Sequence, residues 1–122
     1  MSKITVLVIE PERKPYVKEI ENTLESLQLE VGGCIQAVYP WDEPAALIAD
    51  EESKLKSAPF NRALCDEQGN VYDYIAGTFL IIGLGDEDFT SLSPELIKYF
   101  SEMFASPEIM LNLGGHIIIV QI

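Results

Sequence analysis

The residues with the clearest potential for chemistry are an adjacent polar pair, Asn61 and Arg62, inside an otherwise apolar stretch. A guanidinium in such a place could bind a carboxylate or a phosphate through two parallel hydrogen bonds. With a nearby carboxylate such as Asp66, the pair would form a ligand-binding cleft. The alternative is structural: Arg62 pairs with Asp66, and Asn61 satisfies the backbone of a turn. The structural interpretation is favoured, and the cleft stays open as the alternative.

A second candidate is the aromatic corner around Trp41, which follows Tyr39 and Pro40 and precedes Pro44. Aromatic side chains at such corners often anchor a protein partner. They more often close one end of a hydrophobic core. Trp41 is therefore a candidate binding residue whose favoured role is structural.

Three consecutive acids, Asp86, Glu87 and Asp88, follow an apolar stretch and form a third candidate. Carboxylate oxygens are the ligands that calcium prefers. An EF-hand loop starting at Asp86 would need glycine at its sixth place and glutamate at its twelfth, where the chain has Ser91 and Ile97. The calcium motif therefore fails, and a solvated acidic loop is the favoured interpretation.

The remaining reactive residue types form no recognisable catalytic or metal-binding pattern. Cys34 and Cys65 are isolated, and His116 is the single histidine, so a Cys/His zinc site lacks a fourth ligand within one chain. Gly32-Gly33 follows an expected helix rather than preceding one, and Gly83-Leu84-Gly85 is followed by acids that would repel phosphate. We therefore predict no catalytic residue, no metal and no cofactor.

Charge is the strongest compositional feature of the 122-residue chain, which carries a formal net charge of −12. Residues 1–65 hold 7 basic and 11 acidic side chains, whereas residues 66–122 hold 1 basic and 9 acidic side chains, giving net charges of −4 and −8. This field repels phosphate backbones and anionic lipid surfaces. We expect neither direct nucleic-acid binding nor membrane binding.

Hydrophobic periodicity and turn residues predict the elements that must position these candidates. Strands are expected over 3–9, 34–39, 45–49 and 77–84, a hairpin over 60–64 and 71–74, and helices over 16–30 and from 93 onward. The apolar tail, 116–122, is predicted to form a final strand that packs into the sheet or against a second subunit, because exposed it would promote aggregation.

These elements predict a single globular domain, 1–122, of the α/β or α+β class. The expected architecture is one mixed sheet of about five or six strands with two helices mainly on one face. The order strand, helix, strand at the start suggests a crossover, with a parallel pairing of the first two strands left open. The apolar start is too short for a signal peptide or a membrane helix, which predicts a cytoplasmic protein.

Three segments resemble a family of small bacterial proteins, domain-of-unknown-function family 3846. They are 31–40 (VGGCIQAVYP), 61–70 (NRALCDEQGN) and 75–83 (IAGTFLIIG), and the resemblance covers about residues 4–104. Members of that family are often encoded on phages, plasmids and conjugative elements. The resemblance implies accessory biology of mobile DNA and supplies no catalytic residues.

The favoured function is therefore a non-enzymatic module of a mobile genetic element that binds or modulates a protein partner. A sharper version is a charge mimic of DNA, in which the acids of 66–122 occupy the basic groove of a nucleic-acid-binding protein. One alternative is an enzyme or small-ligand binder with a cleft at Asn61 and Arg62. Another is a structural homodimer that associates through residues 117–122.

Overall fold

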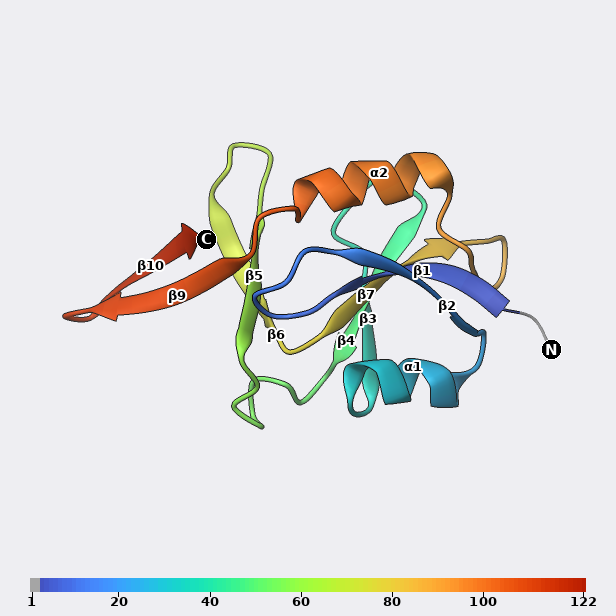
Figure 1. The fold of residues 1–122 in the computed structure, drawn as a ribbon, viewed down its shortest axis with the longest axis horizontal. Coiled ribbons are helices and arrows are strands. Elements are labelled where there is room, and N and C mark those ends of the chain that lie inside the picture. Colours follow the sequence, from blue (N-terminus) through green and yellow to red (C-terminus); the bar gives the residue numbers. More distant parts are fainter. Residues whose placement is uncertain (1–2) are drawn as a thin grey trace.

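The computed structural model describes residues 3–122, which form two helices and ten strands (Figure 1). The strands are β1 (Lys3–Ile9), β2 (Tyr16–Glu21), β3 (Ile35–Val38), β4 (Ala45–Asp50), β5 (Phe60–Cys65), β6 (Val71–Ala76), β7 (Phe79–Leu84), β8 (Phe89–Thr90), β9 (Glu108–Leu113) and β10 (His116–Gln121). The helices are α1 (Leu24–Val31) and α2 (Pro94–Met103). The fold is α+β, and the chain forms more strands, in more sheets, than the sequence predicts.

The main sheet has the strand order β2-β1-β7-β4-β3, with β8 paired to β7. Every pairing between its described strands is antiparallel, so the expected mixed sheet is wrong. The first two predicted strands, now β1 and β3, lie on opposite sides of β7 and β4 rather than forming a parallel pair. Two further antiparallel pairs, β5 with β6 and β9 with β10, stand outside this sheet.

The largest error concerns the helix predicted over 16–30. Residues Tyr16–Glu21 form β2 instead, which pairs along its whole length with β1, from Val8↔Tyr16 to Lys3↔Glu21. The helix starts only after Thr23, whose Oγ1 accepts a hydrogen bond from the Ser26 amide, and ends at Gly32 with a positive φ of 87°. The long-range ladder with β1 therefore outweighs the local helical spacing.

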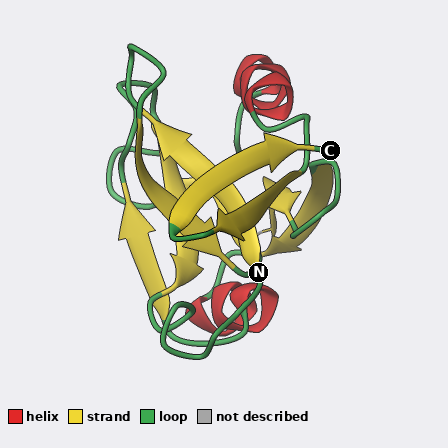
Figure 2. Cartoon of the chain, turned by 90° about the vertical axis from the view of Figure 1, so that its left-hand side faces the viewer, coloured by secondary structure: helices red, strands yellow, loops and turns green. Residues whose placement is uncertain are grey.

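The two helices lie on opposite faces of the main sheet (Figures 1 and 2). On one face Ile81 packs in a cluster with Phe100 of α2, and on the other Ile82 packs in a cluster with Leu27 of α1. The prediction that both helices cover one face is wrong for a physical reason. Successive residues of β7 point to opposite faces, and because nearly all are apolar, both faces must be covered.

None of the helices in residues 3–122 is both long and apolar enough to cross a membrane.

The predicted strands 45–49 and 77–84, the hairpin of 60–64 with 71–74 and the helix after Ser93 are all present. Ser93 caps α2 by accepting the Leu96 amide at its Oγ, with Pro94 at the first helical position. The final strand is present as β10, but it does not join the main sheet. It pairs with β9 in a separate hairpin that projects from the body (Figure 1).

Gly83, where β7 pairs with β8, has no space for a side chain. A Cβ atom built there would lie against the Ser91 carbonyl oxygen and 3.1 Å from Thr90 Cγ2. We expect Gly83→Ala to lower the free energy of unfolding by about 2–3 kcal/mol, as overpacking against a backbone does. Urea unfolding of the variant and the wild type measures this difference in free energy. Gly69→Ala is the control, because a Cβ atom there strains a backbone with a positive φ of 84° but meets no other atom within 4 Å. If Gly83→Ala lowers the free energy of unfolding less than Gly69→Ala does, the steric argument is contradicted.

Candidate functional site

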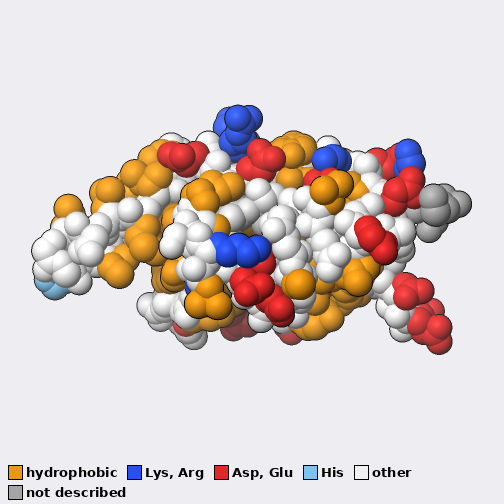
Figure 3. All heavy atoms as spheres, turned by 90° about the horizontal axis from the view of Figure 1, so that it is seen from below, with side chains coloured by type: hydrophobic (Ala, Val, Ile, Leu, Met, Phe, Trp, Pro, Cys, Tyr) orange, Lys and Arg blue, Asp and Glu red, His pale blue; other side chains and the backbone are white. Residues whose placement is uncertain are grey.

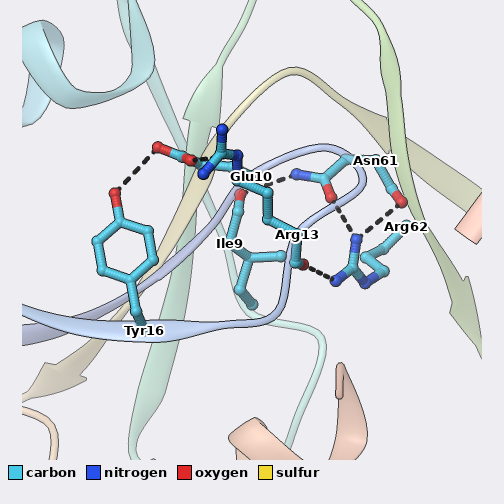
Figure 4. A network of polar contacts seen from close by, with 6 residues as sticks. All are labelled: Ile9, Glu10, Arg13, Tyr16, Asn61 and Arg62. Atoms are coloured by element: carbon cyan, nitrogen blue, oxygen red, sulfur yellow. Dashed lines mark hydrogen bonds and ion pairs between the residues drawn. The ribbon is translucent and has the colours of Figure 1, made fainter. Parts of the chain in front are cut away.

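Asn61 and Arg62 are both completely buried, and both lie in β5 (Figure 4). Adjacent residues of a regular strand point to opposite faces, so this double burial needs an irregularity. The β5–β6 register shifts between Phe60 and Arg62, which marks a β-bulge that leaves Asn61 without a partner in β6. The bulge directs both polar side chains toward the interior.

The Asn61 amide joins two segments that are distant in the sequence. Its Nδ2 donates to the carbonyl oxygens of Ile9 and Gly77, both at 2.8 Å. Its Oδ1 accepts a hydrogen bond of 2.8 Å from Arg62 Nη1. The side chain therefore fixes the end of β1 and the turn between β6 and β7 against β5, rather than satisfying a local turn.

The Arg62 guanidinium is bonded mainly to backbone carbonyls. Nη2 donates to the Arg13 oxygen at 2.6 Å and to the Phe104 oxygen at 3.1 Å, and Nε also donates to Phe104. Among the described residues no carboxylate forms a salt bridge with it. Burial lowers the pKa of Arg62, and the nearby Glu108 carboxylate opposes that shift. The guanidinium remains charged, because the unperturbed pKa of arginine is far above neutral.

Asp66 does not approach Arg62. It stands in the exposed turn between β5 and β6, where its Oδ1 accepts the backbone amides of Gln68 and Asn70. The Arg62–Asp66 pair expected from the sequence is therefore absent. Since Asn61 and Arg62 have no exposed surface, their donors are directed at the protein's own carbonyls and not into an open cleft.

Trp41 closes one end of the core, as the structural interpretation holds. Its ring centroid lies 4.4 Å from that of Phe100 and 6.3 Å from that of Phe104, and it packs against the cluster on the α2 face. Only part of the side chain reaches solvent. Tyr39, two residues earlier, is 60% exposed and is the aromatic side chain that this corner leaves accessible.

The acids Asp86, Glu87 and Asp88 form an exposed loop between β7 and β8. Its backbone is closed by a hydrogen bond of 2.8 Å from the Gly85 amide to the Asp88 carbonyl oxygen. Within residues 3–122 there is no group of three or more Asp, Glu, His or Cys side chains arranged to hold a metal. The cysteines, Cys34 and Cys65, are free and exposed.

Residues 4–105 match the protein family described as "Domain of unknown function (DUF3846)". The chain belongs to the DUF3846 family. No curated protein and no solved structure matches it. The DUF3846 region contains the main sheet, both helices and the β5–β6 hairpin, together with the Asn61–Arg62 network, whereas β9 and β10 follow it.

The hairpin that follows the DUF3846 region carries an exposed apolar face, and only its second strand is predicted from the sequence. Side chains alternate between the two faces of a strand, and the register pairs Leu111 with Ile118 and Ile109 with Val120. One face, here called the apolar hairpin face, consists of Ile109, Leu111, Leu113, Ile118 and Val120, with His116 at its outer end. Leu113 is 56% exposed and Ile118 43% exposed.

The opposite face of the hairpin turns toward the DUF3846 region at its base. Glu108 Oε1 accepts a hydrogen bond of 2.9 Å from the Ala63 amide of β5. Beyond that contact the hairpin extends away from the body, and Figure 3 shows apolar side chains along the projecting part. The two strands are joined by Gly114 and Gly115, both with positive φ, as a tight two-residue turn requires.

Proposed function

We propose that this protein is a non-enzymatic protein-binding module of a mobile genetic element, and that it recognises its partner through the apolar hairpin face. The observation that carries the proposal is the exposure of this face on a projecting two-stranded hairpin. Such a hairpin is at best marginally stable in water by itself and needs further strands or a packed surface. A partner that covers the face would supply that surface.

The exposed side chains of the apolar hairpin face are also large enough to contribute substantially to the free energy of binding. Burying one large apolar side chain fully contributes about 1.5–3 kcal/mol. Leu111, Leu113, Ile118 and Val120 are all at least 36% exposed and are neighbours across the hairpin. Burial of such a group is sufficient to form the core of a protein interface.

The alternative functions receive less support from the geometry. A cleft at Asn61 and Arg62 would need donors that solvent can reach, and both residues are fully buried. A DNA mimic would need a continuous acidic stripe. In Figure 1 the turn between β5 and β6, which contains Asp66, lies well away from the loop between β7 and β8, which contains residues 86–88. The acids on the face in Figure 3 form separate groups with apolar and neutral surface between them. DNA mimicry stays a prediction, and the apolar face is the recognition surface that we favour.

One observation favours a second copy of the chain as the partner. Residues 107–122 contain a single acidic residue, Glu108, and no lysine or arginine, whereas the whole chain has a net charge of −12. Two copies can therefore meet at this hairpin without bringing their main acidic surfaces together. The free edge of β10 and the apolar hairpin face would form a two-fold symmetric contact. The homodimer is our second candidate function.

We expect the double substitution Leu111→Glu/Ile118→Lys to weaken partner binding at least about 100-fold, because two central apolar anchors are lost. The two positions are directly opposite, so the new charges form a cross-strand pair that keeps the hairpin intact. The matched control is Leu29→Glu/Leu55→Lys, which places the same charges on leucines that are 82% and 84% exposed outside the hairpin.

Two measurements check this result. Sedimentation of the wild type, the hairpin variant and the control detects self-association, and affinity capture from the native host with quantitative mass spectrometry detects another partner. A species lost in the hairpin variant and kept in the control supports the proposal. Monomers in all three proteins, with the same captured proteins at the same yield, would remove the hairpin as a binding surface.

A further inference from the structure

A groove of about 410 Å³ lies at the opposite edge of the main sheet from β2, between β3–β4 and the β5–β6 hairpin. Its apolar lining is supplied by β3, β4, β5 and β6, and comprises Val38, Leu47, Ala49, Leu64 and Ile75. Tyr39 and Tyr72 line it as well and are 60% and 57% exposed. The groove is distinct from the apolar hairpin face, and no residue of β9 or β10 is among those that line it.

The strand that borders the groove, β3, has an unpaired edge. It is the last strand of the main sheet and pairs only with β4 among the described strands. The Glu51 amide donates to the Cys34 carbonyl oxygen, which sets the phase of this antiparallel ladder. Because ladder bonds alternate along a strand, Ile35 and Ala37 then present their N–H and C=O groups to the open edge. An extended chain beside β3 would find donors and acceptors there.

The opposite wall of the groove, β6, is held in place by polar contacts. Lys54 Nζ donates to Asp73 Oδ1 at 2.7 Å and lies 4.2 Å from the centroid of the Tyr74 ring. The same Asp73 oxygen accepts the Tyr74 backbone amide at 2.7 Å, so this N–H points away from the ladder with β5. This side of the groove therefore has ordered polar groups at its rim, and the apolar side chains form its base.

The charge of the lining defines the chemistry of an occupant. The charged side chains around the groove are Asp50, Glu51, Asp73 and Lys54, which give a net charge of −2. Asp50 is already paired with Lys56, and Asp73 with Lys54, so Glu51 is the acid with no salt bridge among the described residues. Exposed tyrosine rings favour cations above their faces. The lining thus complements an extended segment that directs apolar side chains into the groove and carries basic residues at its ends.

We propose that this groove binds an extended basic segment of a partner protein, which adds to the open edge of β3 as a further strand. In strand addition, main-chain hydrogen bonds supply affinity and alternate side chains enter pockets that supply specificity. Here the apolar side chains on one face of the segment enter the groove. Lysine or arginine residues at the two ends of the segment meet Glu51, which lies beside the start of β3, and the rings of Tyr39 and Tyr72 at the rim. The proposal goes beyond binding at the hairpin and does not depend on it.

The test uses synthetic peptides of about eight residues, which is within the usual length range of a strand. The probe has valine at alternate central positions, serine between them and two lysines at each end. One control peptide has glutamate in place of each lysine, and a second has the probe's sequence with N-methyl groups on alternate backbone amides, which prevents strand pairing. We expect the probe to bind at least about tenfold more tightly than either control, with amide shifts at Ile35 and Ala37 in NMR spectra of the labelled protein.

Protein variants separate the groove from general charge attraction. Glu51→Lys/Tyr72→Ala should weaken probe binding at least about tenfold, whereas Glu95→Lys/Tyr99→Ala, an equivalent change on the exposed side of α2, should not. The Leu111→Glu/Ile118→Lys hairpin variant should bind the probe like the wild type, so failure at one site is distinguishable from failure at the other. Absence of probe binding, equal binding of the N-methylated peptide, or shifts confined to residues 108–121 would overturn the proposal.

Discussion

Replacing Arg62 with alanine is expected to lower the free energy of unfolding by about 3–5 kcal/mol, a large part of the total stability of a domain of this size. The substitution leaves the carbonyl oxygens of Arg13 and Phe104 and the Asn61 Oδ1 without the donors that now satisfy them, and the bonds to Phe104 and Asn61 are fully buried. Each buried polar group without a partner costs about 1–3 kcal/mol. The loss also frees the β1–β2 connection and the end of α2 from β5.

Two further variants decide whether the lost donors or the lost volume causes this effect. Arg62→Met keeps most of the volume and removes every donor, so we expect it to remain close to alanine in stability. Arg62→Lys keeps the charge and three donors that lack the guanidinium's fork geometry, and should be intermediate. Urea unfolding followed by circular dichroism measures all three. Near wild-type stability of Arg62→Met would show that the hydrogen bonds contribute little.

Arg13→Ala is the matched control for this series. Arg13 lies in the same network, but it contributes its backbone carbonyl to Arg62, and its side chain is 75% exposed in a surface ion pair with Glu10 (Figure 4). The substitution preserves the carbonyl, so we expect a change within about 0.5 kcal/mol. A loss as large as that of Arg62→Ala would mean that the connection is held by the surface pair instead.

Sequence periodicity located the elements whose partners are close along the chain and failed where distant pairing decides. The β5–β6 hairpin and α2 carry their own turn and cap signals, Asp66 to Asn70 and Ser93-Pro94. The segment 16–21 carries apolar residues that fit a helix, and only its pairing with β1 makes it a strand. Thr23, which caps α1, is a local signal that the helix begins later than its apolar spacing suggests.

The last hairpin could have been predicted in full from the sequence. Gly114-Gly115 between the apolar runs 108–113 and 116–121 is a two-residue turn signal, and it implies two strands rather than one. What the sequence does not specify is the surface that covers the hairpin. An apolar tail is compatible with a place in the main sheet, and the order of that sheet follows from pairings over long separations.

The candidate site residues show a similar limit to what the sequence can predict. The unusual position of Asn61 and Arg62 among apolar residues was a correct signal of importance, but residue type alone does not tell a ligand-binding guanidinium from one bonded to backbone carbonyls. The β-bulge at Asn61 decides between them, because it turns both side chains inward. The groove beside β3 was not visible in the sequence, since its lining comes from four strands that only the fold brings together.

Replacing Asn61 with aspartate is expected to destabilise the protein by about 2–4 kcal/mol at neutral pH, although it places a carboxylate beside Arg62. Ionised aspartate has nearly the shape of asparagine but no donor. The carbonyl oxygens of Ile9 and Gly77, each 2.8 Å from Nδ2, would lose their donor and face a negatively charged oxygen. Arg62 already bonds to Oδ1, so the new ion pair gains less than the two lost bonds cost.

The pH dependence separates this explanation from one in which the ion pair dominates. Burial and two facing carbonyl oxygens should raise the pKa of the introduced carboxyl above its value in the unfolded chain. The destabilisation relative to wild type then shrinks as the pH falls through that raised pKa, because protonation restores one donor and removes the repulsion. A dominant ion pair would lower the pKa and give the opposite slope. Asn70→Asp, on the exposed turn, is the control, and its stability relative to wild type should show no such pH dependence. If Asn61→Asp instead becomes more stable relative to wild type as the pH rises toward neutral, Arg62 acts mainly as a charge that needs a counterion and not as a donor to carbonyls.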